Sequence, residues 1–119
     1  MELTETNFSE ETEIQDVIAL KLEESNGRSL IVDSDDKIEL IMKALSSTTR
    51  RKILHYIQQC EEGLDVSNIA AQLDMTEANI SAQIKKLKKA GLIECDYCSG
   101  QHGVRKISKL KYNNLIISF

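Results

Sequence analysis

The fold of this chain is decided by ALSSTTRRKIL (residues 44–54) and SNIAAQLDMTEANISAQIKKLKKAGLI (residues 67–93). The second stretch predicts two short helices, joined by a turn at Asp74 and closed by Ala90-Gly91-Leu92-Ile93 ahead of a β-hairpin. This is the layout of a helix-turn-helix, whose second helix enters the major groove of DNA. We therefore expect the function to reside on the outward face of Thr76–Ala90.

A chain of 119 residues is about one domain. Residues 1–12 are acidic and poor in large apolar side chains, so we expect a disordered tail there. We expect residues 13–34 to form an N-terminal β-hairpin extension, and residues 35–119 a winged helix-turn-helix DNA-binding domain that ends in a strand over Tyr112–Phe119. The predicted fold class is mainly α with a small β-sheet.

The hairpin is predicted from Asn26-Gly27, which lies between two apolar runs. Both residues tolerate the positive φ that a type I′ turn demands. We expect Val17–Leu22 to pair with Leu30–Val32. A helix from Glu13 to Glu24 is the competing interpretation, because apolar residues in this stretch also fit a 3.6-residue period.

The helices are placed by their N-cap residues and apolar stripes. We expect Asp35 or Asp36 to cap the first helix, and Ser46 or Ser47 a second helix that Gly63 ends. Ser67 is expected to cap the third helix and Thr76 the fourth. The hairpin that follows is expected to pair Leu92–Tyr97 with Val104–Ser108. The residues expected to face inward on the four helices are Ile38, Ile41, Met42 and Leu45; Ile53, Leu54, Ile57 and Cys60; Ile69, Ala70 and Leu73; and Ile80, Ile84 and Leu87.

Charge is distributed unevenly along the chain, whose net charge is −4. Met1–Asp36 holds eleven acidic and two basic residues, net −9, whereas Lys37–Phe119 holds thirteen basic and eight acidic residues, net +5. Such asymmetry indicates a nucleic-acid-binding domain with an acidic arm attached.

The predicted fourth helix turns small and amide side chains outward near its start and lysines near its end. Asn79 and Gln83 are expected to read bases, because a side-chain amide can pair bidentately with adenine, and Ala78 and Ala82 allow close approach. Lys85, Lys86, Lys88 and Lys89 are expected to bind phosphates. The predicted DNA-binding residues are Thr76, Ala78, Asn79, Ser81, Ala82, Gln83, Lys85, Lys86 and Lys89 on this helix, with His102, Arg105 and Lys106 in the hairpin.

Three cations, Arg50, Arg51 and Lys52, open the second helix, where the helix dipole disfavours positive charge. Their position indicates either phosphate contact or pairing with acids such as Glu39. An exposed cation also needs no partner at all, which is the plainer interpretation.

Several spaced motifs resemble the ArsR-type winged-helix transcriptional regulators. They are KALS (43–46), TRRKIL (49–54), LDVSNIA (64–70), IS (80–81) and IKKLKKAGLI (84–93); GVRKI (103–107) leading to Lys111-Tyr112 is similar to archaeal predicted regulators related to that group. The resemblance covers roughly Ile38 to Tyr112. It implies a winged-helix fold, a homodimer, the fourth helix in the major groove and the wing on flanking backbone.

The chain departs from that family at several positions. Asp74 stands where the turn commonly has glycine, and Ala82 and Gln83 stand where many members have two histidines. The Cys-x-Cys metal-sensing signature and a C-terminal helix with Asp and His ligands are absent from the sequence, so metal sensing is not carried over.

Cys95 and Cys98, with His102, have a spacing compatible with part of a zinc site, but a structural site needs a fourth ligand. The alternative interpretation places Cys95 under the wing and Cys98 near its tip. We therefore expect neither a bound metal ion nor a cofactor. Cys60 is expected in the core.

No Ser/His/Asp order, catalytic carboxylate pair or glycine-rich phosphate loop is present in the sequence, so we expect no enzyme activity. No apolar run approaches the ~18 residues of a membrane span, and three cysteines without framework spacing fit a reducing cytoplasm. The expected partners are double-stranded DNA and a second copy of the chain, with no membrane and no identifiable small-molecule effector. A protein-interaction adaptor built on the same fold is the alternative.

Overall fold

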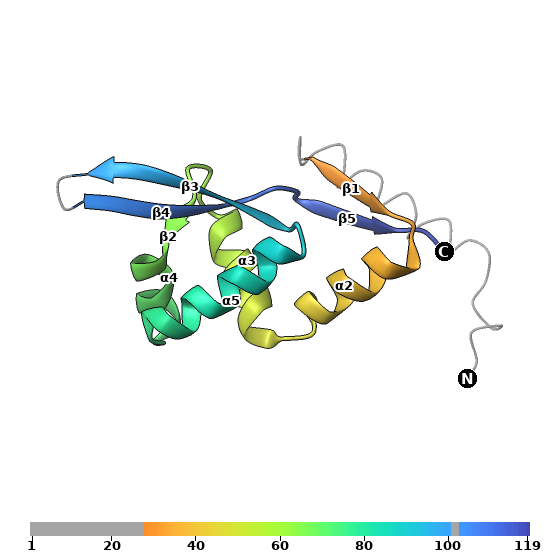
Figure 1. The fold of residues 1–119 in the computed structure, drawn as a ribbon, viewed down its shortest axis with the longest axis horizontal. Coiled ribbons are helices and arrows are strands. Elements are labelled where there is room, and N and C mark those ends of the chain that lie inside the picture. The colour runs from red at the N-terminus through yellow and green to blue at the C-terminus, as the bar shows by residue number, and fades with distance from the viewer. Residues whose placement is uncertain (1–27, 101–102) are drawn as a thin grey trace, which may run out of the picture.

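The fold is a winged helix-turn-helix with a second, small sheet beside it. The computed structural model describes residues 28–100 and 103–119 (Figure 1). Its elements are β1 (Ser29–Val32), α2 (Asp35–Leu45), α3 (Thr48–Gln58), β2 (Leu64–Asp65), α4 (Val66–Leu73), α5 (Glu77–Lys89), β3 (Ile93–Gly100), β4 (Gly103–Leu110) and β5 (Asn114–Ile117). No helix among these residues is both long and apolar enough to cross a membrane.

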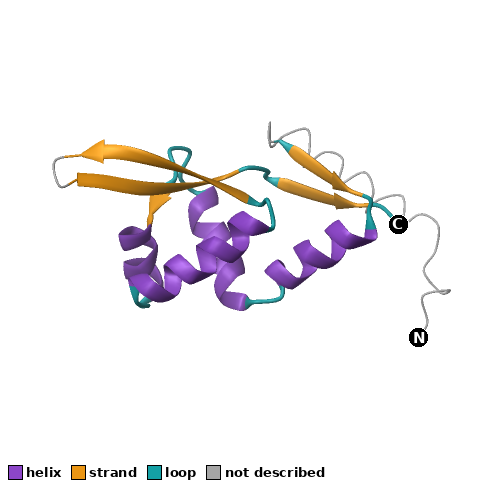
Figure 2. Ribbon diagram, in the orientation of Figure 1, coloured by secondary structure: helices purple, strands orange, loops and turns teal. Residues whose placement is uncertain are grey.

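The core lies between the four helices α2, α3, α4 and α5, the end of β1, and the base of the long strands β3 and β4, which form the wing (Figure 2). The predicted inward face of α5 is confirmed, because Ile80, Ile84 and Leu87 are all 0% exposed. The predicted inward position of Met42 on α2 was wrong, because its side chain is 39% exposed. Ile53 and Ile69 meet them from α3 and α4 and are also fully buried. Each such side chain contributes roughly 1.5–3 kcal/mol through its removal from water.

Two sheets flank this core. The wing sheet has the order β2-β4-β3 and is antiparallel, whereas β1 and β5 form a separate parallel pair in which Ile31 lies beside Ile116. The predicted C-terminal strand is confirmed. Leu30–Val32 is also a strand, and β5 is its described partner; the other half of the predicted hairpin, Val17–Leu22, and its Asn26-Gly27 turn lie outside the described residues.

Two predicted N-caps are confirmed. Ser47 accepts a hydrogen bond from the Arg50 backbone at the start of α3, and Thr76 accepts one from the Asn79 backbone at the start of α5. The cap of α2 was predicted wrongly, because Ser34, one residue earlier, accepts from the Lys37 backbone. The aspartates at 35 and 36 lie in the first turn of α2, where the helix dipole favours acids.

The cap of α4 is Asp65 rather than Ser67. Asp65 is extended and ends the strand β2, and its Oδ1 accepts from the Asn68 backbone at 2.8 Å. The two-residue strand β2 therefore runs directly into the helix. The turn after α4 keeps its left-handed residue without glycine, because Asp74 adopts φ 54° and ψ 50°.

Gly63 does not end α3, which stops at Gln58. It closes a tight turn in which its own N–H donates to the Cys60 carbonyl at 3.0 Å. The Cys60 thiol contacts the Gly63 carbonyl at 3.2 Å and is half-buried, so the prediction of a core position for Cys60 was wrong. The turn presses Gly63 against β4: a Cβ there would lie 2.5 Å from the Ser108 carbonyl oxygen.

The two glycines Gly63 and Gly91 provide a matched test of this packing. Both have positive φ, 86° and 78°, but a Cβ on Gly91 would meet no atom within 4 Å. We expect Gly91→Ala to lower the free energy of unfolding by about 1–2 kcal/mol, the cost of a left-handed L-residue. Gly63→Ala should cost more, because the strand must also move. Urea unfolding of both variants measures the difference, and equal losses would contradict the close approach.

Candidate nucleic-acid interface

The outer surface of α5 is exposed along its whole length. Its first two turns carry small side chains and its last two carry lysines, as the sequence predicted. The exposed residues are Glu77, Ala78, Ser81, Ala82, Lys85, Lys86, Lys88 and Lys89, and the cap residue Thr76 is exposed beside them. The helix thus offers a low, accessible surface near its N-terminus and a cationic one near its C-terminus.

Asn79 and Gln83 lie differently from the other predicted reading residues. Both are half-buried on the flank of α5 that faces α3. The Gln83 Nε2 donates to Asn79 Oδ1 at 3.1 Å, and the Gln83 Oε1 accepts from Arg50 Nη1 at 2.8 Å. Their amides are therefore bonded to each other and to α3.

Arg50 and Arg51 close the end of α2. Arg50 donates through Nε to the Ala44 carbonyl at 2.6 Å and through Nη2 to the Lys43 carbonyl at 3.0 Å. Arg51 donates to the Leu45 carbonyl at 2.6 Å. The last carbonyls of a helix lack internal partners, and these guanidinium groups satisfy them. The suggested pairing with Glu39 was wrong, because Glu39 pairs with Lys43 within α2.

A cationic groove of about 700 Å³ separates α5 from the wing. It is lined by Ser81, Lys85, Lys88, Lys89 and Lys106. None of these lysines takes part in an ion pair with another described residue. Four uncompensated positive charges around one concave surface attract a polyanion.

Positive charge continues on the other flank of α5. A second hollow of about 190 Å³ is lined by Lys43, Arg50, Lys86 and Lys89 together with apolar residues. Lys89 also lines a third hollow of about 220 Å³, where Lys37 and Lys111 join it. The C-terminal half of α5 is therefore bordered by cations from α2, α3 and the wing strand, a surface that we call the cationic face.

The wing is fastened to the start of α4. Arg105 Nε donates to Asp65 Oδ2 at 2.9 Å, while the other oxygen of Asp65 caps α4. One edge of the Arg105 guanidinium is thus occupied by a contact within the protein, although the side chain is 53% exposed. Lys106 points from β4 into the cationic groove. His102, the remaining predicted wing residue, lies outside the described residues.

The two wing cysteines do not converge. Cys95 and Cys98 are three positions apart in β3, so their side chains leave opposite faces of the strand. Cys95 is half-buried near the Ser108 hydroxyl at 3.6 Å, whereas Cys98 is exposed. Within residues 28–100 and 103–119 no three His, Cys, Asp or Glu side chains are grouped as metal ligands would be.

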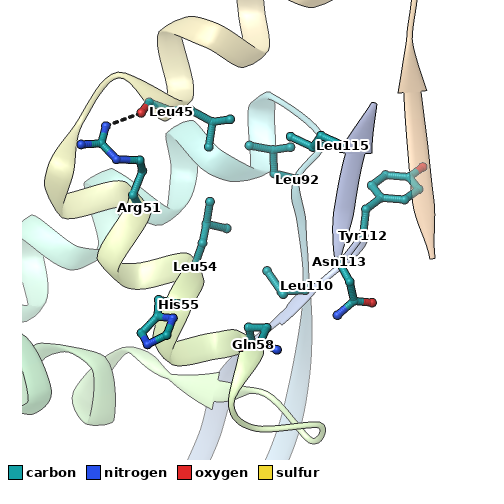
Figure 3. A pocket seen from close by; sticks show the side chains of 10 residues that line it. All are labelled: Leu45, Arg51, Leu54, His55, Gln58, Leu92, Leu110, Tyr112, Asn113 and Leu115. Atoms are coloured by element: carbon teal, nitrogen blue, oxygen red, sulfur yellow. Dashed lines mark hydrogen bonds between the residues drawn. The ribbon is translucent and has the colours of Figure 1, made fainter. Parts of the chain in front are cut away.

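An apolar pocket of about 330 Å³ lies apart from the cationic face, between α3, the base of the wing and β5 (Figure 3). Its lining is Leu45, Leu54, Leu92, Leu110 and Leu115, with Arg51, His55, Gln58, Tyr112 and Asn113. No residue of α5 contributes to it. This pocket therefore adds nothing to the surface that α5 presents.

Sequence reasoning missed the part that Arg50 plays. The signal was present, because cations at the start of a helix are unfavourable and call for a compensating contact. That contact is with carbonyls and an amide of other helices, which no local pattern reveals. Lys37, Lys43 and Lys111 were likewise not predicted as neighbours of α5, because three separate elements bring them there.

Residues 47–94 match the family described as "Bacterial regulatory protein, arsR family". No curated protein matches the chain. Among solved structures, the winged helix-turn-helix DNA-binding domain of a possible ArsR-family transcriptional regulator from Mycobacterium bovis, described as homodimeric, is 29% identical with a TM-score of 0.55. The match covers 63% of this chain and 64% of that one, so the chain spans less than two thirds of this relative.

Two further structures agree in fold. An ArsR family transcriptional regulator is 24% identical with a TM-score of 0.54 over 67% of this chain and 76% of the other. A possible transcriptional regulator from Methanosarcina mazei is 14% identical with a TM-score of 0.51 over 63% and 65%. The fold of the chain is a winged helix-turn-helix, and its residues 47–94 are similar to the arsR family of bacterial regulatory proteins.

Proposed function

We propose that this chain is a sequence-specific DNA-binding transcriptional regulator that acts as a homodimer. The observation that carries the proposal is the cationic groove between α5 and the wing, beside an exposed helix surface with small side chains. A major groove admits an α-helix, and its flanking phosphates meet cations on both sides of that helix. The family match and the fold support the same role.

We assign two kinds of contact to the predicted residues. Asn79 and Gln83 read bases, with Thr76, Ala78, Ser81 and Ala82 allowing close approach. Phosphates are held by Lys85, Lys86, Lys89, His102, Arg105 and Lys106, which give affinity without sequence information. For Arg105 only the part of the guanidinium not bonded to Asp65 is available for this contact.

We also propose a dimer contact, a cellular location and a group of related regulators. The Mycobacterium bovis domain is described as homodimeric, and here Ile31 and Ile116, side by side in the β1–β5 sheet, are 62% and 37% exposed. We place the dimer contact on this sheet or on α2, where Leu40 and Met42 are exposed. We also propose a cytoplasmic location for the protein. We further propose that residues 103–107 relate it to archaeal predicted regulators.

A protein-interaction adaptor is the second candidate, because the sequence joins a net −9 arm to a net +5 domain. In that case the acidic arm, and not DNA, would meet the cationic face. Selection of bound duplexes from a random pool with the full chain tests the choice. Enrichment of a site supports the regulator, and failure to enrich any site favours the adaptor.

Deletion of residues 1–12 also distinguishes the regulator from the adaptor. A regulator should bind its duplex as tightly or more tightly without these residues, because four acids are removed from a chain that binds a polyanion. An adaptor that relies on the arm should lose its partner. Titration of a labelled duplex with both chains measures the change, and weaker DNA binding by the shortened chain would count against the regulator.

Lys85→Ala tests the phosphate contacts. Lys85 lines the cationic groove, so we expect weaker binding to every duplex and a salt dependence whose slope, log K against log salt, falls by about 0.9. Lys52→Ala is the matched control, because Lys52 is exposed on α3 and lines none of the hollows described above. An equal loss in both variants would show that the groove has no special part in binding.

The dimer contact is tested by placing a charged side chain in it. Ile31→Lys or Met42→Lys should shift the sedimenting species from dimer to monomer, because a buried lysine without a partner opposes association. Lys109→Ala, on the wing, serves as the control and should leave the mass unchanged. A wild-type chain that sediments as a monomer at every concentration would overturn the dimer.

A further inference from the structure

We propose that Arg50 turns the amides of Gln83 and Asn79 so that α5 offers hydrogen-bond donors to DNA, and that guanine is the purine read by them. The inference rests on the DNA-binding function proposed above and specifies its recognition step. It replaces the expected pairing of these amides with adenine.

The amide orientations follow from the chemistry of the partners. A guanidinium group has donors and no acceptor, so the Gln83 atom 2.8 Å from Arg50 Nη1 is the oxygen. The Gln83 nitrogen then lies on the other side, 3.1 Å from Asn79. A nitrogen donor requires an acceptor, so Asn79 turns its oxygen to Gln83 and keeps its NH₂ group free of this chain of bonds.

Arg50 is held firmly enough to impose this order. Its Nε and Nη2 donate to the Ala44 and Lys43 carbonyls at 2.6 and 3.0 Å, so three of its nitrogens are engaged. The residue is half-buried, and it cannot leave Gln83 without exposing or abandoning these contacts. The end of α2 and the reading flank of α5 are therefore joined through one planar group.

The remaining groups define which base edge fits. A bidentate pair with adenine needs one donor and one acceptor from a single amide. The Gln83 oxygen already accepts one bond from Arg50 and the Asn79 oxygen one from Gln83, so each keeps a single lone pair, whereas both hydrogens of the Asn79 NH₂ group and the second N–H of Gln83 remain available as donors. Guanine presents N7 and O6, two neighbouring acceptors, in the major groove, while adenine places a donor next to N7.

The experiment compares the duplexes that three full-length proteins select from a random pool. These are the wild type, Arg50→Met, and the matched control Arg51→Met, which also loses a bond to an α2 carbonyl but touches neither amide. We expect the wild type and Arg51→Met to enrich guanine at one position and to prefer it over adenine. Arg50→Met, which releases the Gln83 oxygen, should reduce that preference by roughly tenfold.

Asn79→Asp gives a second measurement that leaves Arg50 in place. The carboxylate still accepts from Gln83 but offers no donor, so the ratio of guanine to adenine should fall whatever happens to total affinity. Replacing the enriched guanine with 7-deazaguanine, which lacks the N7 acceptor, should weaken the wild type by a larger factor than Asn79→Asp, which keeps only the second N–H of Gln83 as a donor.

Two results would overturn the inference while the DNA-binding function stands. One is enrichment of adenine by the wild type at the position that Asn79→Asp alters. The other is an unchanged guanine preference in both Arg50→Met and Asn79→Asp. Enrichment of no site by any of the proteins would instead overturn the proposed function, and the inference with it.

Discussion

Ile80, Ile84 and Leu87 are fully buried against α3 and the base of the wing, and this burial determines which side of α5 remains outside. Three large side chains at helical spacing cannot be returned to water without a loss of several kcal/mol. Rotation of α5 about its axis is therefore prevented. The exposed surface of small residues and lysines is a consequence of that constraint.

Around this fixed helix, the polar contacts set the positions of the neighbouring parts. Asp65 ends β2, caps α4 and holds Arg105 of the wing, so one carboxylate joins the strand, the helix and the hairpin. Lys106, the next residue of β4, then faces the groove beside α5.

Arg50 has a comparable part on the opposite flank. It satisfies two carbonyls at the end of α2 and one amide of α5, and thus transmits the position of α2 to the residues expected to read bases. If α2 takes part in the dimer contact, as proposed, Arg50 connects that contact to α5 within each subunit. The helix dipole gives Arg50 no reason to lie at the start of α3, so these contacts are its physical explanation.

Much of the fold was predictable because its signals are local. The inward stripe of α5, the caps at Ser47 and Thr76, the left-handed turn at Asp74 and the C-terminal strand were all predicted and are present. The caps of α2 and α4 were missed by one or two residues, since several neighbouring Ser and Asp residues compete and only backbone geometry selects among them. The parallel pairing of β1 with β5 joins opposite ends of the chain, and no periodicity predicts such a contact.

By itself, the sequence determined the class of the fold, the face of α5 that is buried and the separation of an acidic N-terminal segment from a basic remainder. These depend on residue spacing and composition, which a linear chain displays directly. Only the tertiary structure decided what the exposed face offers, because Gln83 is bonded to Arg50 and Arg105 to Asp65, residues 33 and 40 positions away. An amide can donate or accept, and its neighbours in space choose between the two.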